Sequence, residues 1–299
     1  MRYLVIANPA TRRSSPRIVE RLKLACPPDI ELDVHTTLGP RLARVLVEQH
    51  LPGVSAVVVI GGDGTVGEVA SVLVGTDVPL AIIPAGSTNI IAQELGIPTN
   101  VRSAVRFVFS PWTARKIDVG RVGEHYFLHM AGAGVDSRMF TLANPRMKRL
   151  IGWLAYLPAG GKALFEAPAR FTLEIDGQTK SVVSPLVLIA NGGSVISPRL
   201  KLMQRLQADD GVLDVLIFRA TSVRPAMMTL LDMFRRRLDR SIHVEHHAAR
   251  TLTLSSDPPL PVELDGDVVT TTPVTIEIRP SALYVIAPVI QPSRKSRRS

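Results

Sequence analysis

The residues best suited to chemistry form a glycine-rich segment, Gly61-Gly62-Asp63-Gly64-Thr65-Val66-Gly67, directly after the apolar run Val54–Ile60. Glycines allow the backbone to approach a phosphate closely, and a helix that begins here would offer unpaired N–H groups and the positive end of its dipole. A tight strand-to-helix turn without a ligand is the alternative. Three glycines in the four residues 61–64 favour a phosphate-binding loop.

The same segment also matches a dinucleotide-binding fingerprint through Gly62, Gly64 and Gly67. That fingerprint requires an acidic residue about 20 positions later, at the end of the next strand, to hold a ribose. The next apolar run ends at Ile82–Pro84 without a carboxylate. The carboxylate of Asp63 would repel a bare pyrophosphate. A Mg²⁺ ion that bridges the carboxylate and the phosphate removes this repulsion, and phosphoryl transfer requires such an ion. No Gly-Lys-Ser/Thr follows, so the P-loop pattern is missing. The pattern therefore favours a kinase of another family.

The elements around this loop alternate between apolar strands and helical patterns in the first third of the chain. The uninterrupted run Val57–Ile60 is typical of a parallel strand buried on both faces. We expect an α/β N-terminal domain over residues 1–120 with a mostly parallel layered sheet. The predicted strands are Tyr3–Ala7, Ile30–Thr36, Val54–Ile60 and Leu80–Ile83, and the predicted helices are Leu42–His50, Thr65–Val74 and Thr88–Leu95.

The pattern then changes to short strands separated by turn residues, which predicts a C-terminal antiparallel β-sandwich or barrel-like domain with helical insertions over residues 121–290. Asp176-Gly177 and Asp265-Gly266 are predicted hairpin turns. The run Ala282–Val289 fits either domain, and residues 291–299 form a basic tail expected to be disordered. The predicted strands are Phe171–Asp176, Ser181–Ala190, Val212–Phe218, Thr251–Ser255, Val262–Leu264 and Val274–Ile278.

The composition of the 299-residue chain, with 46% hydrophobic and 20% charged residues, is that of a folded protein. Its single cysteine, Cys26, excludes an intramolecular disulfide, and no apolar run approaches the ~20 residues of a membrane span. We expect a cytoplasmic protein that meets a membrane only at its surface. The net charge of +9 favours anionic partners. With 5% aromatic residues and no reading motif, nucleic acid is not expected among them.

Two stretches, 137–165 and 224–240, combine apolar and basic residues. We favour the interpretation that both pack their apolar side chains into the core. The alternative is an interfacial surface in which these side chains enter lipid and the basic ones meet anionic headgroups. In the second stretch the apolar stripe and the basic residues near its end are Met227, Leu230, Leu231, Phe234 and Leu238, with Arg235, Arg236, Arg237 and Arg240.

Several further segments accompany the glycine-rich loop and Glu68 along the chain. Each segment alone is weak evidence of a family, but their order and spacing together are strong evidence. They are Asn8-Pro9, Pro84–Asn89, Ile117–Gly120, Gly132–Asp136, Asp209–Asp214 and Leu264–Asp267. With these segments the chain resembles, over nearly its whole length, the diacylglycerol kinase catalytic family. That family includes bacterial lipid kinases and sphingosine and ceramide kinases, and is more distantly related to NAD kinases and phosphofructokinases.

The resemblance implies that ATP lies between the two domains. Ser87 stands where the family usually has threonine, and it keeps the hydroxyl. Gly67 stands where asparagine is common, and Ala10–Arg13 replaces a glycine-containing turn. The residues implied to touch ATP are Asn8, Thr36, Gly61, Gly62, Asp63, Gly64, Thr65, Val66, Gly67 and Ser87.

The resemblance also assigns roles to acidic residues. Asp267 takes the place of the glutamate that accepts the proton of the acceptor hydroxyl, one methylene shorter. From residue types alone, Asp265–Asp267 would be read as a hairpin turn. Asp63 and Asp118 are the candidates for the catalytic Mg²⁺, which they would hold directly or through water. Asp136 is expected to be structural or part of the acceptor site.

A second Mg²⁺ is implied at Asp210, with backbone carbonyls of Gln207 and Val212, while a β-turn without an ion fits these residues equally well. The seven histidines show no metal-binding spacing, and we interpret them as surface residues.

We therefore expect an ATP- and Mg²⁺-dependent kinase that phosphorylates a hydroxyl of a diacylglycerol, a sphingoid base or a related lipid at a membrane surface, with a homodimer left open. One alternative is an NAD kinase-like enzyme. Another is a non-catalytic lipid- or nucleotide-binding protein in which Asp267 marks a decayed site.

Overall fold

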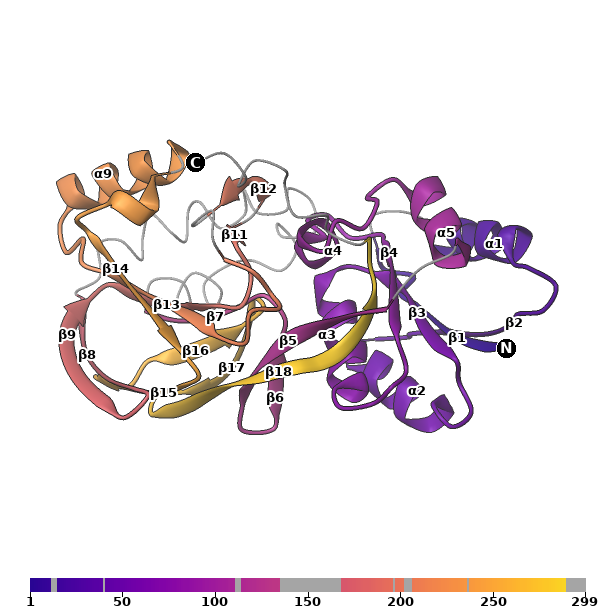
Figure 1. The fold of residues 1–299 in the computed structure, drawn as a ribbon, viewed down its shortest axis with the longest axis horizontal. Coiled ribbons are helices and arrows are strands. Elements are labelled where there is room, and N and C mark those ends of the chain that lie inside the picture. Colours follow the sequence, from indigo (N-terminus) through magenta and orange to yellow (C-terminus); the bar gives the residue numbers. More distant parts are fainter. Residues whose placement is uncertain are drawn as a thin grey trace, which may run out of the picture.

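The computed structural model describes residues 1–11, 15–39, 41–110, 114–134, 168–195, 197–201, 206–235 and 237–288. Arg12, Arg13, Asp136, the stretch 137–165 and the tail 291–299 lie outside these residues, and so do the predictions made for them. The two halves of the chain lie side by side, with the N-terminal half in indigo to magenta and the C-terminal half in orange to yellow (Figure 1). No helix among the described residues has the length and apolar character needed to cross a bilayer.

The N-terminal half is a parallel sheet with helices on both faces. Its strands run in the order β2-β1-β3-β4 and all pair in parallel. Alternate residues of β1 face two separate apolar cores, with Leu4 and Ile6 in one and Tyr3 and Val5 in the other. The predicted α/β layered sheet is thereby confirmed. Its elements are β1 (Arg2–Ala7), α1 (Ser15–Ala25), β2 (Glu31–Thr36), α2 (Leu42–His50), β3 (Ala56–Gly61), α3 (Asp63–Leu73), β4 (Leu80–Pro84), α4 (Ile90–Glu94) and α5 (Val101–Phe109).

The C-terminal half is the predicted antiparallel sandwich. One sheet has the order β14-β13-β10-β7-β16-β17, and a shared apolar core joins it to strands β5, β8, β15 and β18 of the other. Its elements are β5 (Ala114–Val122), β6 (His125–Phe127), β7 (Met130–Gly134), β8 (Ala169–Ile175), β9 (Gln178–Ser184), β10 (Leu186–Ala190), β11 (Ser194–Val195), β12 (Ser197–Lys201), β13 (Leu213–Phe218), α9 (Val223–Phe234), the 3₁₀ turn η2 (Leu238–Arg240), β14 (Val244–Ala249), β15 (Thr251–Asp257), β16 (Pro261–Leu264), β17 (Asp267–Thr271) and β18 (Val274–Ile286).

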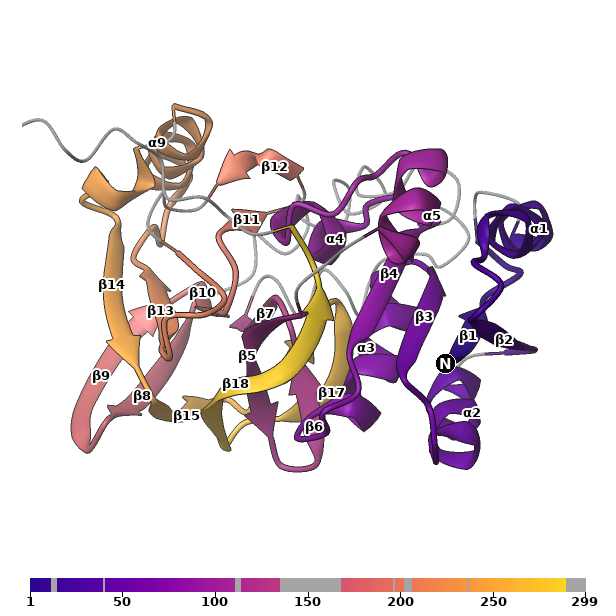
Figure 2. The same ribbon diagram turned by 45° about the vertical axis from the view of Figure 1, so that its right-hand side comes forward.

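The last strand, β18, links the two halves. It pairs antiparallel with β15 and β5, and its residue Val285 pairs in parallel with Leu80 of β4. Figure 2 shows β18 curving between the two halves. One sheet therefore runs from the N-terminal half into the C-terminal half, and this continuity fixes how the halves lie relative to each other.

The stretch predicted as one strand, Ser181–Ala190, is two strands in different sheets. Pro185 separates β9 from β10, and proline has no N–H for a ladder. Ser184 stabilises the point at which the chain passes from one sheet to the other. Its Oγ donates to the carbonyl of Phe218 (2.6 Å) and accepts the N–H of Leu186 (3.1 Å). The apolar run alone did not reveal this change of sheet.

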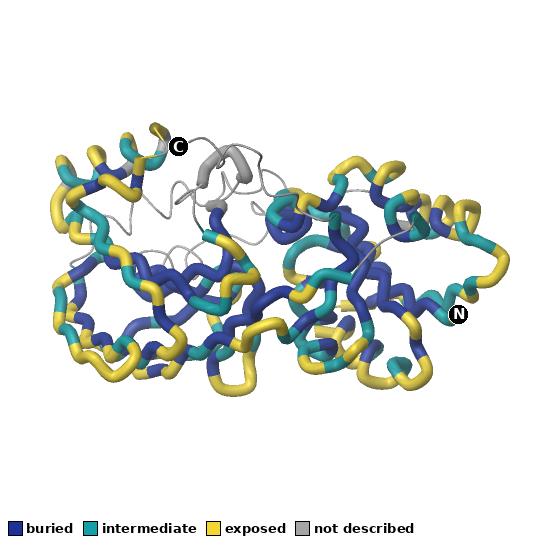
Figure 3. Tube along the Cα trace, viewed as in Figure 1, coloured by how far each residue is buried: buried dark blue, intermediate teal, exposed yellow. Residues whose placement is uncertain are grey.

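Helix α9 leaves two residues of the stripe that we assigned to the core exposed. Met227 is 62% exposed and Leu231 is 46% exposed, while Leu238 beyond the helix is buried. Figure 3 shows most of the described part of α9 in the colours of exposed and intermediate residues. The core interpretation is therefore wrong for Met227 and Leu231, because the helix lies on the surface of the second sheet, which is the sheet β14-β13-β10-β7-β16-β17.

Candidate active site

Four parallel strands bring their carboxyl ends to one edge of the N-terminal sheet. Ala7 of β1 pairs with Thr36 of β2 and with Ile60 of β3, and Gly61 pairs with Pro84 of β4. Ligands of open α/β sheets bind at this edge. The predicted ATP contacts Asn8, Thr36 and Ser87 therefore lie at the same edge as the glycine-rich loop, with Thr36 and Ser87 exposed.

The glycine-rich loop is shorter than we expected, because α3 begins at Asp63 and not at Thr65. Gly62 alone connects β3 to the helix, and a Cβ on it would lie 3.2 Å from the Cα of Gly86. In contrast, a Cβ on Gly64 or Gly67 would meet nothing within 4 Å. Gly62 is therefore needed for packing, whereas Gly64 leaves the first turn of α3 open to a ligand.

This open turn suits a phosphate group. The first N–H groups of a helix have no partner within it, and they lie at the positive end of its dipole. The first backbone bond of α3 runs from the N–H of the buried Val66 to the carbonyl of Gly62 (3.0 Å). The N–H groups before Val66 are those that a phosphate would accept from.

Two asparagines shape the loops at this edge. Asn8 donates from Nδ2 to the Oγ1 of the buried Thr65 (2.9 Å), so the end of β1 is tied to the first turn of α3. Asn89 adopts a left-handed conformation with φ 50°. Its side chain accepts the N–H of Gly86 (2.8 Å) and donates to the carbonyl of Gly86 (2.9 Å). These bonds pre-form the two loops before any ligand binds.

Glu68 of α3 also positions a loop. Its two carboxylate oxygens accept the N–H groups of Arg41 (3.0 Å) and Ala43 (3.1 Å), at the start of α2. Arg41 has φ 61° and makes no side-chain cap of its own. Glu68 therefore supplies the cap from another helix and holds the turn that follows Thr36.

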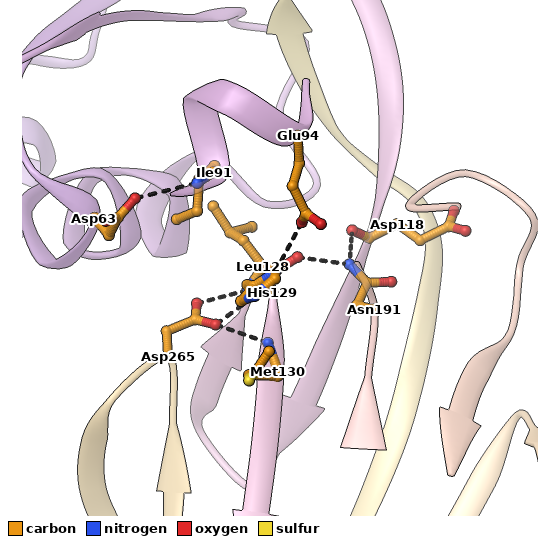
Figure 4. Close-up of polar contacts among 9 residues, drawn as sticks. All are labelled: Asp63, Ile91, Glu94, Asp118, Leu128, His129, Met130, Asn191 and Asp265. Carbon is orange, nitrogen blue, oxygen red and sulfur yellow. Dashed lines mark hydrogen bonds and ion pairs between the residues drawn. The ribbon is translucent and has the colours of Figure 1, made fainter. Parts of the chain in front are cut away.

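Asp63 joins α3 to α4. Its Oδ1 accepts the N–H of Ile91 (3.1 Å) at the start of α4 (Figure 4). Burial raises the pKa of Asp63, and the backbone N–H groups of Ile91, Ile90 and Asn89 and the charge of His129 oppose that rise only in part. A cation beside this carboxylate would favour its ionised form.

Asp118 lies apart from Asp63. Both of its oxygens accept backbone N–H groups, Oδ2 from Gly211 (2.6 Å) and Oδ1 from Ser281 (2.7 Å). Figure 4 shows Asp118 beyond Asn191, with its carboxylate pointing away from Asp63. The structure therefore does not bring together the two carboxylates that we assigned to one Mg²⁺. Asp118 instead holds the turn that contains Asp210.

The Asp210 turn has the conformation of the predicted β-turn, with Gly211 at φ 77° and the N–H of Val212 donating to Oδ1 of Asp210 (3.3 Å). Asp210 and Gln207 are exposed, so a cation could reach them. Burial raises the pKa of Asp210, and the nearby acidic residues raise it further. An added cation would relieve that repulsion, so the residues present fit the implied metal. The acidic neighbours are Asp214, Asp118 and Asp209.

The Asp265-Gly266 hairpin lies beside α4. Asp265 (φ 49°) and Gly266 (φ 93°) connect β16 to β17, so the predicted turn is confirmed. The carboxylate of Asp265 accepts the N–H groups of Leu128 (2.8 Å), His129 (2.9 Å) and Met130 (3.0 Å). Asp267, the predicted proton acceptor, follows as the exposed first residue of β17.

Sequence reasoning missed one buried pair at this site. His129 Nδ1 lies 2.7 Å from Glu94 Oε2, and His129 is only 4% exposed. The interpretation of all histidines as surface residues is therefore wrong for His129. Its position in the run Phe127–Met130, where the flanking residues are apolar, was the available signal of burial.

A second histidine group also forms without a signal in the spacing. His35, His50 and Asp33 have potential ligand atoms within 4.8 Å of one another, at the outer edge strand β2 and the end of α2. His35 Nε2 already contacts Asp33 Oδ1 at 2.7 Å. This group lies apart from the glycine-rich loop and takes no part in the site.

Family models match both halves of the chain. A family model described as "Diacylglycerol kinase catalytic domain" matches residues 2–122, and one described as "YegS C-terminal NAD kinase beta sandwich-like domain" matches residues 129–287. The second match alone spans more than half of the 299 residues. The chain therefore belongs to the family that combines these two domains, a diacylglycerol kinase catalytic domain and a YegS-type C-terminal domain.

Individual relatives and a solved structure are similar to this chain over most of its length. "Uncharacterized protein sll0036" of Synechocystis is 30% identical over 79% of this chain, which spans 56% of that relative's length. "Putative lipid kinase SH2167" of Staphylococcus haemolyticus is 29% identical over 81% of this chain and 80% of its own. A solved structure from Bacillus anthracis, described as that of "a putative diacylglycerol kinase", has a TM-score of 0.81 at 22% identity, covers 96% of this chain and 95% of its own, and shows the shared fold.

Proposed function

We propose that this protein is a lipid kinase that uses ATP and Mg²⁺ to phosphorylate a hydroxyl of a diacylglycerol, a sphingoid base or a related lipid. The observation that supports the proposal is the open first turn of α3, which begins with Asp63. Asp63 contacts the start of α4, and Glu94 at the end of α4 contacts His129 in the half that bears Asp267. The lipid-kinase names of the staphylococcal relatives support the choice of acceptor.

In this proposal, the N–H groups at the start of α3 would bind the phosphates of ATP, and Asp63 would hold a Mg²⁺ ion that would neutralise part of the phosphate charge. Asp267 accepts the proton of the lipid hydroxyl while the hydroxyl oxygen bonds to the γ-phosphorus of ATP and the bond from that phosphorus to ADP breaks. The exposure of Asp267 leaves room for an acceptor delivered from outside. A second Mg²⁺ at Asp210 would stabilise the turn that Asp118 holds.

The direct test incubates the purified protein with γ-labelled ATP, Mg²⁺ and mixed micelles of diacylglycerol, sphingoid base or long-chain alcohol. We expect labelled phosphomonoester from at least one lipid, none after chelation of Mg²⁺, and none with Asp63→Asn. NAD added as acceptor in a parallel reaction tests the NAD kinase alternative. Binding of ATP without transfer to any lipid would contradict the proposal.

We also propose that α9 contacts an anionic membrane surface from the cytoplasmic side. Its exposed apolar residues lie beside exposed arginines, a combination that suits the boundary between headgroups and acyl chains. Replacing Met227 and Leu231 by serine should reduce co-sedimentation with anionic vesicles. Unchanged sedimentation would contradict this contact. The residues involved are Arg224, Met227, Met228 and Leu231 of α9 and, in the segment that follows it, Arg235, Arg237, Arg240 and Ile242.

A further inference from the structure

The contact between Glu94 and His129 crosses from one half of the molecule to the other. Glu94 is the last residue of α4 in the N-terminal half, and His129 immediately precedes β7 of the second sheet. Their side chains are 13% and 6% exposed, with 2.7 Å between Oε2 and Nδ1. A buried carboxylate is costly unless it is paired, so this contact is a specific feature of the interface between the halves.

The backbone of Gly192 packs directly against this pair. A Cβ added to Gly192 would collide with Glu94 Oε2 and would lie 2.8 Å from His129 Nδ1. The backbone of this segment also holds His129, because the N–H groups of Asn191 (2.8 Å) and Gly192 (3.1 Å) donate to its carbonyl. The imidazole and the carboxylate are therefore fixed against the end of β10.

The pair is the middle of a continuous polar path (Figure 4). At one end of the five-residue α4, the N–H of Ile91 binds Asp63 of the phosphate-binding helix. At the other end, Glu94 binds His129, whose own N–H donates to Asp265. Asp265 opens the hairpin that carries Asp267, two residues further on. Hydrogen bonds and one short helix thus connect the helix end proposed to bind ATP with the hairpin of the proposed proton acceptor.

Electrostatics favour a charged pair. Burial by itself would lower the pKa of His129, but the hydrogen bond and charge of Glu94 and the charges of Asp265 and Asp63 outweigh it, so the pKa is raised. These three carboxylates come from α4, from the β16–β17 hairpin and from α3. A protonated His129 therefore attracts acidic groups of both halves at once.

We propose that Glu94 and His129 are a positioning pair that sets the spacing between the phosphate-binding end of α3 and the Asp265–Asp267 hairpin. This inference rests on the proposed kinase function. The pair acts on the reaction through Asp63 and the hairpin, and neither side chain is assigned a contact with substrate. Loss of the pair should therefore lower the rate of transfer more than the binding of ATP, because misplacement by about 1 Å costs roughly 100-fold in rate.

The test is a double-mutant cycle of Glu94→Gln, His129→Gln and the double variant. We expect each single variant to lower kcat by about 10- to 100-fold with the KM for ATP within about twofold, and the double variant to be no slower than the slower single one. Glu48→Gln, which removes the exposed ion pair with Arg44 on α2, is the control and should leave kcat unchanged.

If kcat is unaltered in Glu94→Gln, or if the two single effects on kcat simply multiply in the double variant, the inference is wrong. The proposed function is unaffected by either result, provided that the wild type phosphorylates a lipid. Absence of turnover in the wild type on every lipid would overturn both. Glu94→Gln is nearly isosteric, so it keeps the test valid even where His129→Gln does not fold. The same cycle measured by urea unfolding reports the contact independently of turnover.

Discussion

Two hairpins of the C-terminal half are built alike and lie in different surroundings. Asp176-Gly177 connects β8 to β9, and Asp265-Gly266 connects β16 to β17, with φ values of 45° and 86° in the first and 49° and 93° in the second. In each, the aspartate N–H donates to the carbonyl of a neighbouring segment, Thr251 in one and Met130 in the other. Each carboxylate accepts backbone N–H groups of that same segment.

The difference lies in what each aspartate holds. Asp176 is exposed and binds the N–H groups of Arg250 and Thr251, at the start of β15. Asp265 binds three N–H groups around His129, and burial raises its pKa. The same Asp-Gly turn therefore stabilises a strand end at one place and forms part of the candidate active site at the other. The role of each turn depends on the segment whose N–H groups its aspartate binds.

The largest difference should appear when both aspartates are replaced by asparagine, which tolerates the left-handed conformation but accepts fewer N–H groups. We expect Asp265→Asn to lower the free energy of unfolding by about 2–3 kcal/mol, since it leaves buried N–H groups without partners. Asp176→Asn should cost less than about 1 kcal/mol, because water reaches the exposed N–H groups there. Urea unfolding measures both, and equal losses would remove the distinction between the hairpins.

The next comparison concerns the first residue after each glycine, Asp267 in one hairpin and Gln178 in the other. Both are exposed, so neither Asp267→Asn nor Gln178→Asn should change stability by more than about 0.5 kcal/mol. Steady-state lipid phosphorylation should fall by about 100-fold or more in Asp267→Asn and stay unchanged in Gln178→Asn.

Asp267→Glu sharpens this result. A rate within about tenfold of wild type would mean that aspartate already serves as the proton acceptor. A wild type without activity that gains it with glutamate would instead indicate a decayed site.

Sequence reasoning predicted both hairpins but not their difference. The Asp-Gly pair determines a local backbone conformation, and the strands follow from local apolar patterns. The pairing of Glu94 with His129 joins residues 35 positions apart in different halves, and no local pattern encodes it. The backbone contacts of Asp118 could not be predicted for the same reason, because its oxygens accept the N–H groups of Gly211 and Ser281, which only the folded chain brings near.

A smaller effect should appear in the pH dependence of stability. Of the two aspartates, only Asp265 binds the backbone of a histidine, His129. The pKa of His129 is raised above 6.5, so its stabilising contribution is present below pH 6.5 and is lost as the pH rises through the raised value. Urea unfolding should show wild type losing about 1.5 kcal/mol over this range relative to Glu94→Gln. Asp176→Asn should keep the wild-type pH dependence. A Glu94→Gln variant with that same dependence would show that Glu94 does not hold the proton on His129.

The smallest effect should be the one that the two hairpins share. Gly177→Ala and Gly266→Ala each place a Cβ at positive φ, 86° and 93°, which costs about 1 kcal/mol. Alanine keeps the N–H that Gly266 donates to Glu263 (2.7 Å), so this hydrogen bond is retained. We expect urea unfolding to give losses that agree within about 0.5 kcal/mol. A much larger loss at Gly266 would mean that the turns themselves differ, and that the contrast between the hairpins does not come from the segments their aspartates hold.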